Sequence, residues 1–408
     1  MLQTGDEEVV MESSSNLPLP EAFLNFLNQN GLDPSIYAAT QSIPRYIRLK
    51  PGCEDRISEI EAEINCELRE VYWLPNFYCL PPDVGIASTK AYQEGQVYGI
   101  DAASGAAVSA LGVSPGDHVL DLCAAPGAKL CMILDLLGGS GSVTGVDISR
   151  HRLAASRTML QKYKLGERCR LFVADGTKFS LIPTRVLEKS KSCIECGNAE
   201  LEENFEIFKE WTSKKPWKER KRIANSRKKN ITSDKSLHIQ DPELIFYGRH
   251  SGVAGFSKSD VYQDVKDHEF SLFGYDKVLV DAECTHDGSI KHIQKFEQWG
   301  WETLSRRVLD AERTDDLTAL QLKLLTNGFK LLKVGGSLVY STCSLTVAQN
   351  EDVVEKFLSQ NASAELVEIE AGKNWPCGGA RIQKTLRFDP LTSSTSGLFI
   401  AKFKKIAI

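Results

Sequence analysis

Residues 118–129, HVLDLCAAPGAK, constrain the fold of this chain more than any other stretch. A short apolar run ends at Asp121, small residues follow, and an apolar pattern with helical spacing comes next. This order predicts a buried strand, a tight turn and a helix, which is how an α/β sheet builds a nucleotide-type pocket. Ala124, Ala125 and Gly127 would leave room for a ligand beside the backbone amides that open the helix. In the alternative, the same small residues serve only the packing of the turn.

The composition is that of an ordinary globular protein. The chain has 408 residues, 42% hydrophobic and 25% charged, enough for two domains or for one large α/β domain with an appendage. Because the net charge is −5, a nucleic-acid partner would have to be held by a local basic patch. Eleven cysteines without regular spacing indicate free thiols in a reducing compartment.

No targeting or membrane signal is expected. Residues 1–16 are acidic and rich in serine, which predicts a disordered tail rather than a secretory or mitochondrial leader. No apolar run approaches the ~18 residues that span a bilayer. We therefore expect a cytoplasmic or nuclear protein, neither secreted nor membrane-bound. Its oligomeric state is not set by the sequence.

Residues 17–95 are predicted to form a small α+β domain. Helical spacing is found at 18–31 and 54–65, and strand-like runs follow Pro44 and residue 66. These runs carry basic and aromatic residues that would neutralise and stack on single-stranded nucleic acid, or, for the aromatics, fill the core. The residues are Arg45, Arg48, Lys50, Tyr72, Trp73, Phe77 and Tyr78.

Residues 96–408 alternate between strand-like and helical patterns with short connections. Strands are predicted at 118–124, 142–147, 170–175, 277–283, 337–344, 364–370 and 397–404, and helices at 127–138, 150–163, 316–332 and 350–358. Such alternation predicts a Rossmann-like, doubly wound parallel sheet. The fold class is therefore α/β, with the small α+β domain before the sheet.

An insertion that is largely mobile is predicted at about residues 181–270, because the alternation stops there. Cys193 and Cys196 lie in it, but no second cysteine pair completes the four ligands of a zinc site, so no metal is expected. The basic run at 214–229 would grip phosphates, direct nuclear import, or be a solvated loop.

Three of the predicted strands end in an acid: Asp121, Asp147 and Asp175. The carboxyl ends of parallel strands line one crevice, and an acid after the second strand accepts hydrogen bonds from ribose hydroxyls. The first turn lacks the glycines of a dinucleotide site and the chain has no Walker lysine motif, so S-adenosyl-L-methionine fits better than NAD or ATP. Helix capping is the alternative role for Asp147 and Asp175.

Two cysteines, Cys284 and Cys343, follow apolar strands at the same predicted edge. A single buried cysteine is usually a small hydrophobe. Two of them near Asp281 and Lys129 indicate covalent chemistry instead.

The motifs VLDLCAAPGAK, GVDIS, VADGTKF, VDAEC and YSTCSLT followed by QNED occur in this order. Together they resemble the Nop2/Sun (RsmB-like) family of RNA cytosine-5 methyltransferases, over roughly residues 18–405 apart from the insertion. The resemblance implies a methyltransferase sheet, S-adenosyl-L-methionine as cofactor, and RNA as partner, with tRNA or rRNA favoured.

The resemblance also implies catalytic roles. The nucleophile of the family is the cysteine of the Thr-Cys-Ser motif, which is Cys343 here, and it adds to C6 of cytosine so that C5 can accept a methyl group. Asp281 would hydrogen-bond the base and Lys129 would help to hold it. Cys284 matches the residue that assists release of the methylated product. The nucleotide must be extruded or already unpaired.

For the cofactor, the resemblance places Asp147 at the ribose, Asp175 at the adenine amino group and residues 124–127 at the methionine end. Arg152 stands at the basic position of the family after the ribose acid. The full set expected at the cofactor is Cys123, Ala124, Ala125, Pro126, Gly127, Lys129, Asp147, Arg152, Asp175 and Asp281.

The chain departs from the family where Glu283 replaces a proline in the sequence Asp-Ala-Glu-Cys-Thr-His. A flexible residue there would shift Cys284 and impair elimination. One alternative is therefore a catalytically silent RNA-binding protein that kept the fold. Another is a methyltransferase with a substrate other than RNA, although methylation of an amine or hydroxyl needs no thiol nucleophile. Because Cys343, Cys284 and Asp281 are all present, an active enzyme is favoured.

Overall fold

The computed structural model describes residues 19–38, 43–183, 208–209, 241–263 and 267–407. The predicted tail at 1–16 lies outside this part of the chain. So do most of the predicted insertion, the Cys193–Cys196 pair and the basic run at 214–229.

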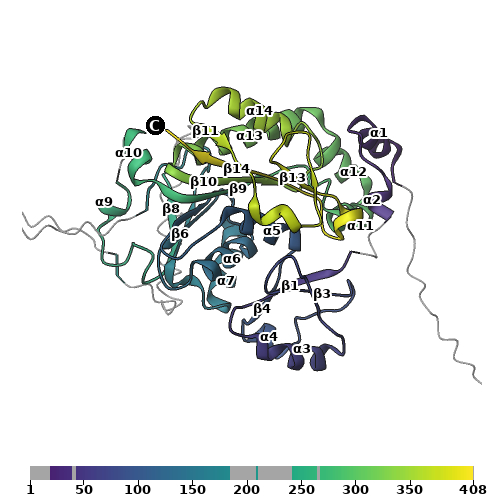
Figure 1. Ribbon diagram of the computed structural model, residues 1–408, viewed down its shortest axis with the longest axis horizontal. Helices are drawn as coiled ribbons and strands as arrows, with labels where there is room; N and C mark the ends of the chain where they lie inside the picture. Colours follow the sequence, from purple (N-terminus) through teal and green to yellow (C-terminus); the bar gives the residue numbers. More distant parts are fainter. Residues whose placement is uncertain (1–18, 39–42, 184–207, 210–240, 264–266, 408) are drawn as a thin grey trace, which may run out of the picture.

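A mainly parallel sheet forms the centre of the molecule (Figure 1), with the strand order β12-β13-β14-β10-β9-β5-β6-β7-β8. Its parallel strands are β5 (His118–Asp121), β6 (Ser142–Asp147), β7 (Cys169–Val173), β9 (Tyr275–Asp281) and β10 (Leu332–Thr342). From β5 the chain builds β6 and β7 towards one edge and then returns to add β9 and β10 on the other side. This reversal beside β5 is the switch point at which doubly wound sheets bind ligands. The predicted Rossmann-like fold is confirmed.

Helices cover both faces of the sheet, as Figure 1 shows. One face carries α5 (Ala102–Leu111), α6 (Ala128–Leu137) and α7 (Arg150–Lys162), and the other carries α10 (Asp267–Phe273), α13 (Ala311–Lys330) and α14 (Glu351–Gln360). Each face has its own buried apolar cluster, and the strands are apolar on both sides, as parallel strands must be.

The C-terminal strands close one edge of this sheet. They are β11 (Ala364–Leu366), β12 (Gly378–Gly379), β13 (Leu386–Phe388) and β14 (Leu398–Lys405), with η5 (Glu370–Asn374) and α15 (Pro390–Ser393) between them. Strand β14 runs antiparallel to β10. The strand predicted at 364–370 is β11, which ends at Leu366 and is shorter than expected. Helix α13 begins five residues before the predicted start at 316.

At the other edge of the sheet, the structure differs from the largely mobile insertion predicted at about residues 181–270. Strand β8 (Glu243–Tyr247) pairs antiparallel with β7, and η3 (Gly166–Arg168) and the short helix α9 (Lys258–Val261) lie near it. The described part of the predicted insertion therefore includes an edge strand of the sheet, because the apolar residues Leu244, Phe246 and Tyr247 pair with β7 and pack on the core on its two faces.

A second, smaller antiparallel sheet lies below the first in Figure 1, with the order β2-β3-β1-β4. Its strands are β1 (Arg45–Leu49), β2 (Arg69–Glu70), β3 (Phe77–Leu80) and β4 (Val97–Gly99), accompanied by η2 (Glu54–Arg56), α3 (Ile57–Ile64) and α4 (Lys90–Gln93). The predicted single strand after residue 66 is a hairpin, and β4 extends this sheet beyond residue 95. We call this unit the small lobe.

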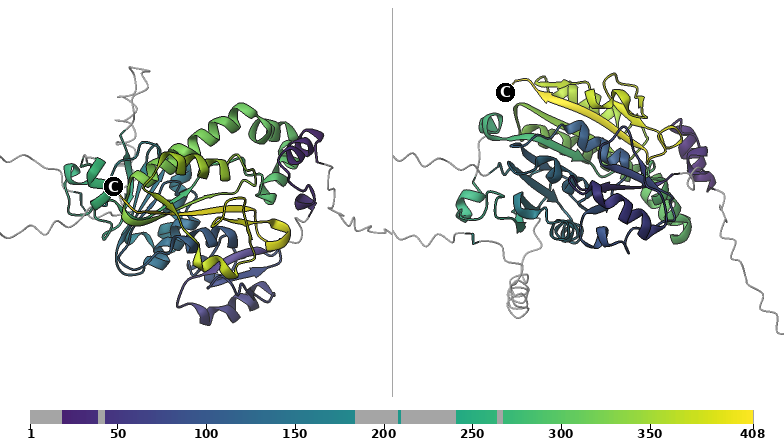
Figure 2. Two further views of the ribbon diagram at one scale, coloured as in Figure 1. Left: turned by 45° about the horizontal axis from the view of Figure 1, so that its top comes forward. Right: turned by 60° about the horizontal axis from the view of Figure 1, so that its bottom comes forward.

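The first helices do not belong to the small lobe. Helices α1 (Glu21–Gln29) and α2 (Ser35–Ala38) pack on α11 (Ile290–Trp299), α12 (Trp301–Leu304) and η4 (Ser305–Leu309), as the views of Figures 1 and 2 agree. Phe23 and Leu27 enter this cluster, and the Tyr37 hydroxyl donates a hydrogen bond to the carbonyl oxygen of Asp287 at 2.8 Å. The N-terminal helices therefore support a loop that carries site residues.

The residues predicted to contact nucleic acid in the small lobe divide into core and surface. Arg48 is buried and pairs with Asp135 of α6 at 3.5 Å, so its prediction as a contact residue is wrong. Phe77 is buried as well, which is the core role left open for the aromatic residues. Trp73 packs against Trp375 and Phe388.

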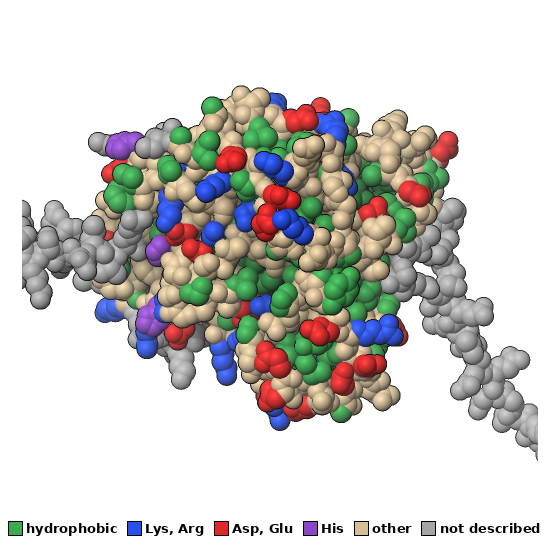
Figure 3. All heavy atoms as spheres, in the orientation of Figure 1, with side chains coloured by type: hydrophobic (Ala, Val, Ile, Leu, Met, Phe, Trp, Pro, Cys, Tyr) green, Lys and Arg blue, Asp and Glu red, His purple; other side chains and the backbone are tan. Residues whose placement is uncertain are grey.

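The remaining candidates are more open. Lys50 donates to the carbonyl oxygen of Tyr163 at 2.8 Å, Arg45 to that of Pro82 at 3.3 Å, and Tyr78 is half-buried. Tyr72 is 84% exposed. Figure 3 shows acidic side chains over the bottom of this lobe, where α3 contributes Glu59, Glu61 and Glu63. That surface of α3 would repel phosphates.

Among the helices that the structure describes, none combines the length and the apolar character needed to cross a bilayer.

Candidate active site

The three predicted acids lie at the carboxyl ends of three neighbouring strands of the large sheet. Asp121 ends β5, Asp147 ends β6, and Asp175 follows β7 by two residues. The register pairs Asp121 with Gly145 and Asp147 with Val173, so the three strand ends are direct neighbours. The structure thus brings these acids together as predicted.

Each acid is held by backbone amides. Asp121 accepts a hydrogen bond from the Cys123 amide at 3.1 Å, Asp147 from Ser149 at 2.8 Å and Ala125 at 3.3 Å, and Asp175 from Thr177 at 2.9 Å. For Asp147 and Asp175 these are the local capping contacts that the sequence left open as an alternative. A carboxylate has lone pairs for further partners, so the contacts fix the side chains without exhausting them.

The environment of Asp121 is unusual. Its side chain is 1% exposed, and burial, with added repulsion from Asp281 and Asp147, raises the pKa of Asp121 to about 7. Burial also raises the pKa of Asp147, while the amide of Ser149 opposes the rise. A positive charge placed in the crevice would be stabilised by both groups.

The turn between β5 and α6 is packed against α7. Gly127 has φ +113°, and a Cβ at this position would lie 2.9 Å from Ser156 Cα. The Ser156 hydroxyl donates to the Ala124 carbonyl at 3.2 Å, and Arg152 donates to the Ala125 carbonyl at 2.9 Å. Gly127 is therefore required for packing, and Arg152 holds the turn.

Two side chains at this edge remain open. Pro126 is exposed, and Ile148, directly after Asp147, is 71% exposed. A large apolar side chain at such a position offers a surface on which a flat ring can pack.

A second group of site residues joins β9, β10 and α6. Lys129 Nζ lies 2.7 Å from Asp281 Oδ2 and 3.1 Å from Ser104 Oγ, and Ser341 Oγ donates to Asp281 Oδ1 at 2.7 Å. Burial acts to lower the pKa of Lys129, but the charge of Asp281 and its hydrogen bond outweigh burial and raise the pKa. Lys129 therefore stays a cation and fixes the orientation of the Asp281 carboxylate.

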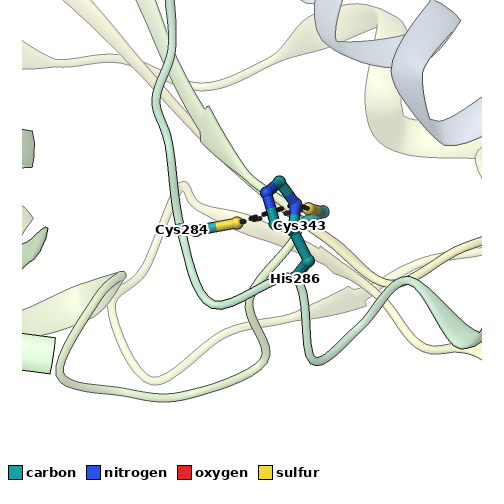
Figure 4. A group of neighbouring side chains, drawn as sticks. All are labelled: Cys284, His286 and Cys343. Carbon is teal, nitrogen blue, oxygen red and sulfur yellow. Dashed lines mark hydrogen bonds between the residues drawn. The ribbon is translucent and has the colours of Figure 1, made fainter. Parts of the chain in front are cut away.

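Cys284 and Cys343 meet at the ends of β9 and β10. Their Sγ atoms are 3.2 Å apart without a covalent bond, and His286 Nδ1 lies 2.9 Å from Cys343 Sγ and 3.7 Å from Cys284 Sγ (Figure 4). Cys284 is fully buried, whereas Cys343 and His286 are partly exposed. The partly exposed sulfur is thus the one that a substrate can reach.

The three side chains share their protons. Burial acts to raise the pKa of Cys284, but the hydrogen bond from Cys343 and the charge of His286 lower it to about 6. The hydrogen bond to Cys284 and burial raise the pKa of Cys343. The charge of Cys284 raises the pKa of His286. The group therefore contains a thiolate at neutral pH.

Glu283, the departure from the family sequence, does not leave this loop loose. The side-chain amide of Gln321 donates to the Glu283 carbonyl oxygen at 2.8 Å, and the backbone amide of Thr285 donates to Gln349 Oε1 at 3.1 Å. The Glu283 side chain is exposed and pairs with Arg313 at 3.4 Å, a surface contact of small energy.

The two cysteine loops also bond directly to each other. The Gly288 amide donates to the Cys343 carbonyl oxygen at 2.9 Å, and the Leu345 amide donates to Asp287 Oδ2 at 2.7 Å. Cys284 and Cys343 are thereby held at a fixed separation.

Four described residues of this site were not predicted from the sequence: Ser341, His286, Gln321 and Gln349. Ser341, His286 and Gln349 lie within the quoted sequences but had no assigned role. Gln321 carries no local signal, because its partner Glu283 is 38 residues away.

These features define the class of protein: the doubly wound sheet, its antiparallel last strand and the crevice at its switch point are those of a Rossmann-like methyltransferase. A methyltransferase homolog protein from Pyrococcus horikoshii has a TM-score of 0.57 at 21% identity, covering 95% of this chain and 100% of that chain. NSun6 from Pyrococcus horikoshii with SFG has a TM-score of 0.59 at 15% identity, covering 95% and 99%. At these identities the likeness shows the shared fold.

The family follows from the sequence comparison. The model of the 16S rRNA methyltransferase RsmB/F family matches residues 108–189 and 255–404, more than half of the chain. The chain therefore belongs to this family, and the predicted Nop2/Sun (RsmB-like) membership is confirmed.

Curated relatives carry consistent names. The chain is 23% identical over 322 residues to ribosomal RNA small subunit methyltransferase B of Pseudomonas syringae pv. tomato, covering 79% of this chain and 50% of the relative. It is 24% identical over 347 residues to rRNA (cytosine-C(5))-methyltransferase NOP2C of Arabidopsis thaliana, covering 76% and 53%. The chain thus spans about half the length of these two relatives.

Proposed function

We propose that this protein transfers a methyl group from S-adenosyl-L-methionine to C5 of a cytosine in RNA, through a covalent bond between Cys343 and C6. The observation that carries the proposal is the arrangement at the ends of β9 and β10. A reachable thiol lies 3.2 Å from a second, buried thiol, beside an Asp281 carboxylate that Lys129 and Ser341 hold in place. Methylation of an amine or hydroxyl would need neither cysteine.

The residues at the ends of β5, β6 and β7 fit the cofactor. Asp121, buried and with a pKa raised to about 7, favours a cation nearby, and S-adenosyl-L-methionine carries positive ammonium and sulfonium groups. Asp147 retains lone pairs that would accept from ribose hydroxyls, and Ile148 would cover the adenine ring. Asp175 would accept from the adenine amino group, and residues 124–127 would contact the methionine end.

When bound, S-adenosyl-L-methionine supplies an electrophilic methyl group. C5 of cytosine is a poor nucleophile until C6 carries an electron-rich substituent. Cys343 provides it by forming an S–C6 bond, and its proton passes to Cys284, 3.2 Å away. Asp281 accepts hydrogen bonds from the edge of the base as N3 takes up a proton from solvent, and Lys129 holds that carboxylate in its orientation.

Release of the product requires a base. Once C5 carries the methyl group, its remaining proton must leave while the C6–S bond breaks and Cys343 departs as a thiolate. Cys284 is the group placed to take this proton, after its own has returned to solvent. N3 then gives up its proton, and the aromatic base is restored.

RNA is the proposed substrate class because the relatives are named for it. The Pseudomonas relative is a ribosomal RNA methyltransferase, and a relative from Pyrococcus abyssi, 31% identical over 143 residues, is a tRNA (cytosine(49)-C(5))-methyltransferase. In the small lobe, the exposed Tyr72 is the aromatic side chain best placed to stack on an unpaired base.

The covalent step is tested by Cys284→Ala. Without the base for release, the S–C6 bond persists, so incubation with RNA and cofactor should yield a protein–RNA adduct that survives denaturing electrophoresis. Wild type should show little adduct because it turns over. The matched control is the Cys284→Ala, Cys343→Ala double variant, which has no nucleophile and should show none. A Cys284→Ala protein that methylates RNA at the wild-type rate without adduct would refute the role of Cys284.

A further inference from the structure

We propose that Cys284, His286 and Cys343 form a binding site for Zn²⁺, which closes the active site when it is occupied. The donor atoms of the three side chains all lie within 4.8 Å of one another. Figure 4 shows His286 and Cys284 approaching Cys343 from the loop after β9, so two separate loops supply the donors. This site goes beyond the proposed methyl transfer, and its formation does not depend on it.

The separations suit a zinc ion. With Zn–S bonds of ~2.3 Å and Zn–N bonds of ~2.0–2.1 Å, neighbouring ligand atoms of a tetrahedral site lie about 3.5–3.8 Å apart. The observed separations are 3.2 Å between the sulfurs, and 2.9 and 3.7 Å from His286 Nδ1 to Cys343 and Cys284. Shifts of less than about 0.7 Å per pair would therefore complete the ligand geometry.

The donor types also match. Two soft thiolate sulfurs and one imidazole favour the borderline-soft zinc ion over magnesium or calcium. Three protein ligands leave a fourth tetrahedral position, which water would fill through the partly exposed side of Cys343 and His286. Both sulfurs bind as thiolates, so the thiol proton that remains at neutral pH is replaced by a metal–sulfur bond and released to solvent.

The surrounding structure holds the donors ready. The bonds of Gly288 to Cys343 and of Leu345 to Asp287 fix the two loops against each other. The His286 ring packs on His292 with centroids 5.1 Å apart. Little ordering is therefore left for the ion to impose.

Occupancy has a chemical consequence. A zinc ion would coordinate the sulfurs of both Cys343 and Cys284. Neither addition of Cys343 to C6 nor release of the methylated product could then proceed. His286 is the residue that turns the cysteine pair into a three-donor site.

Equilibrium dialysis of the full chain against Zn²⁺, with a phosphine reductant to keep the thiols free, tests the site without RNA. Wild type should retain one equivalent of zinc that His286→Gly and Cys343→Ser lose. Since loss of outer partners of metal ligands alone weakens binding about 10–100-fold, loss of a ligand should weaken it at least about tenfold. His286 has φ +59°, a conformation that glycine adopts readily, so the variant should fold.

Two matched controls locate the ion. Cys66→Ser, in the small lobe, and the Cys193→Ser, Cys196→Ser pair should both retain the equivalent. Co²⁺ in place of Zn²⁺ should give thiolate-to-metal absorption in wild type that Cys343→Ser lacks. Zinc that survives His286→Gly and Cys343→Ser but is lost with Cys193 and Cys196 would overturn the proposal, as would a wild-type chain that retains none.

Inhibition is read separately. If the chain methylates RNA, stoichiometric Zn²⁺ should abolish methylation in wild type, and a chelator should restore it. A chain that binds zinc at this site but shows no methylation under any condition would contradict the proposed function and leave the zinc site standing.

Discussion

Asp121 carries the most perturbed carboxyl group at the edge of the sheet. Because burial raises its pKa to about 7, the folded protein holds a proton here that the unfolded chain, with a value near 3.8, releases. The resulting stabilisation is complete below about pH 4 and is lost as the pH rises through about 7. The free energy of unfolding should therefore fall over this range by up to ~1.4 kcal/mol per pH unit.

Asp121→Asn removes this titration while its side-chain oxygen can still accept from the Cys123 amide. The variant should be more stable than wild type by roughly 4 kcal/mol at pH 8, with little difference at pH 4. Urea unfolding at both pH values measures this. The control is Asp83→Asn, an exposed aspartate, which should keep the wild-type pH dependence. An Asp121→Asn variant that also keeps it would contradict the burial argument.

At the residue scale, the sequence predicted which side chains meet but not what holds them. Asp121, Asp147, Asp281, Cys284 and Cys343 each follow an apolar strand, and parallel strands bring such positions to one edge. Glu283 stands where the family has a proline, and hydrogen bonds with the side chains of Gln321 and Gln349 restrain the loop backbone there instead. Long-range side-chain partners of this kind leave no periodic signal, so only the structure resolves the effect of Glu283.

At the scale of elements, the turn from β5 to α6 packs closely against α7. Gly127→Ala would place a methyl group 2.9 Å from Ser156 Cα in a left-handed conformation that alanine rarely adopts. We expect a loss of about 2–4 kcal/mol in the free energy of unfolding, because α7 must move away from the turn.

The comparison variant is Gly139→Ala, since the structure shows nothing within 4 Å of a Cβ at that position. It should change the free energy of unfolding by less than about 1 kcal/mol. Chemical denaturation of the two variants makes the comparison. Equal stabilities would show that the turn has space for a Cβ at position 127. That result would support the interpretation in which the small residues leave room for a ligand.

Element prediction succeeded where the pattern was long and repeated. The parallel strands and the helices between them were found because each strand is apolar on both faces and each connection is short. Strand β8 was missed because it is one antiparallel edge strand separated from its partner by a long interval. The β2–β3 hairpin was read as one strand because its turn, residues 71–76, is itself rich in apolar residues.

At the scale of the whole molecule, the small lobe and the large sheet share one core. Tyr46, Leu74 and Phe77 belong to the same buried cluster as α5 and α6, and the Phe77 ring lies against Gly105. The two units should therefore unfold together rather than in sequence.

Phe77→Ala should lower the free energy of unfolding by about 3–5 kcal/mol. The variant should still unfold in a single transition, at a lower denaturant concentration than wild type, and circular dichroism and tryptophan fluorescence should report the same midpoint. Tyr72→Ala, at an exposed aromatic in the same lobe, should shift it by no more than about 0.5 kcal/mol. Two separate transitions, of which only one responds to Phe77→Ala, would show that the lobe is an independent domain.

The central claim is that this fold and cysteine pair methylate cytosine in RNA. The measurement that tests it most directly is transfer of labelled methyl from S-adenosyl-L-methionine to total cellular RNA, with wild type compared with Cys343→Ala. We expect label at C5 of cytosine with wild type and none with Cys343→Ala. Absence of label with both proteins, despite confirmed cofactor binding, would contradict it and favour an RNA-binding protein that kept the fold without the activity.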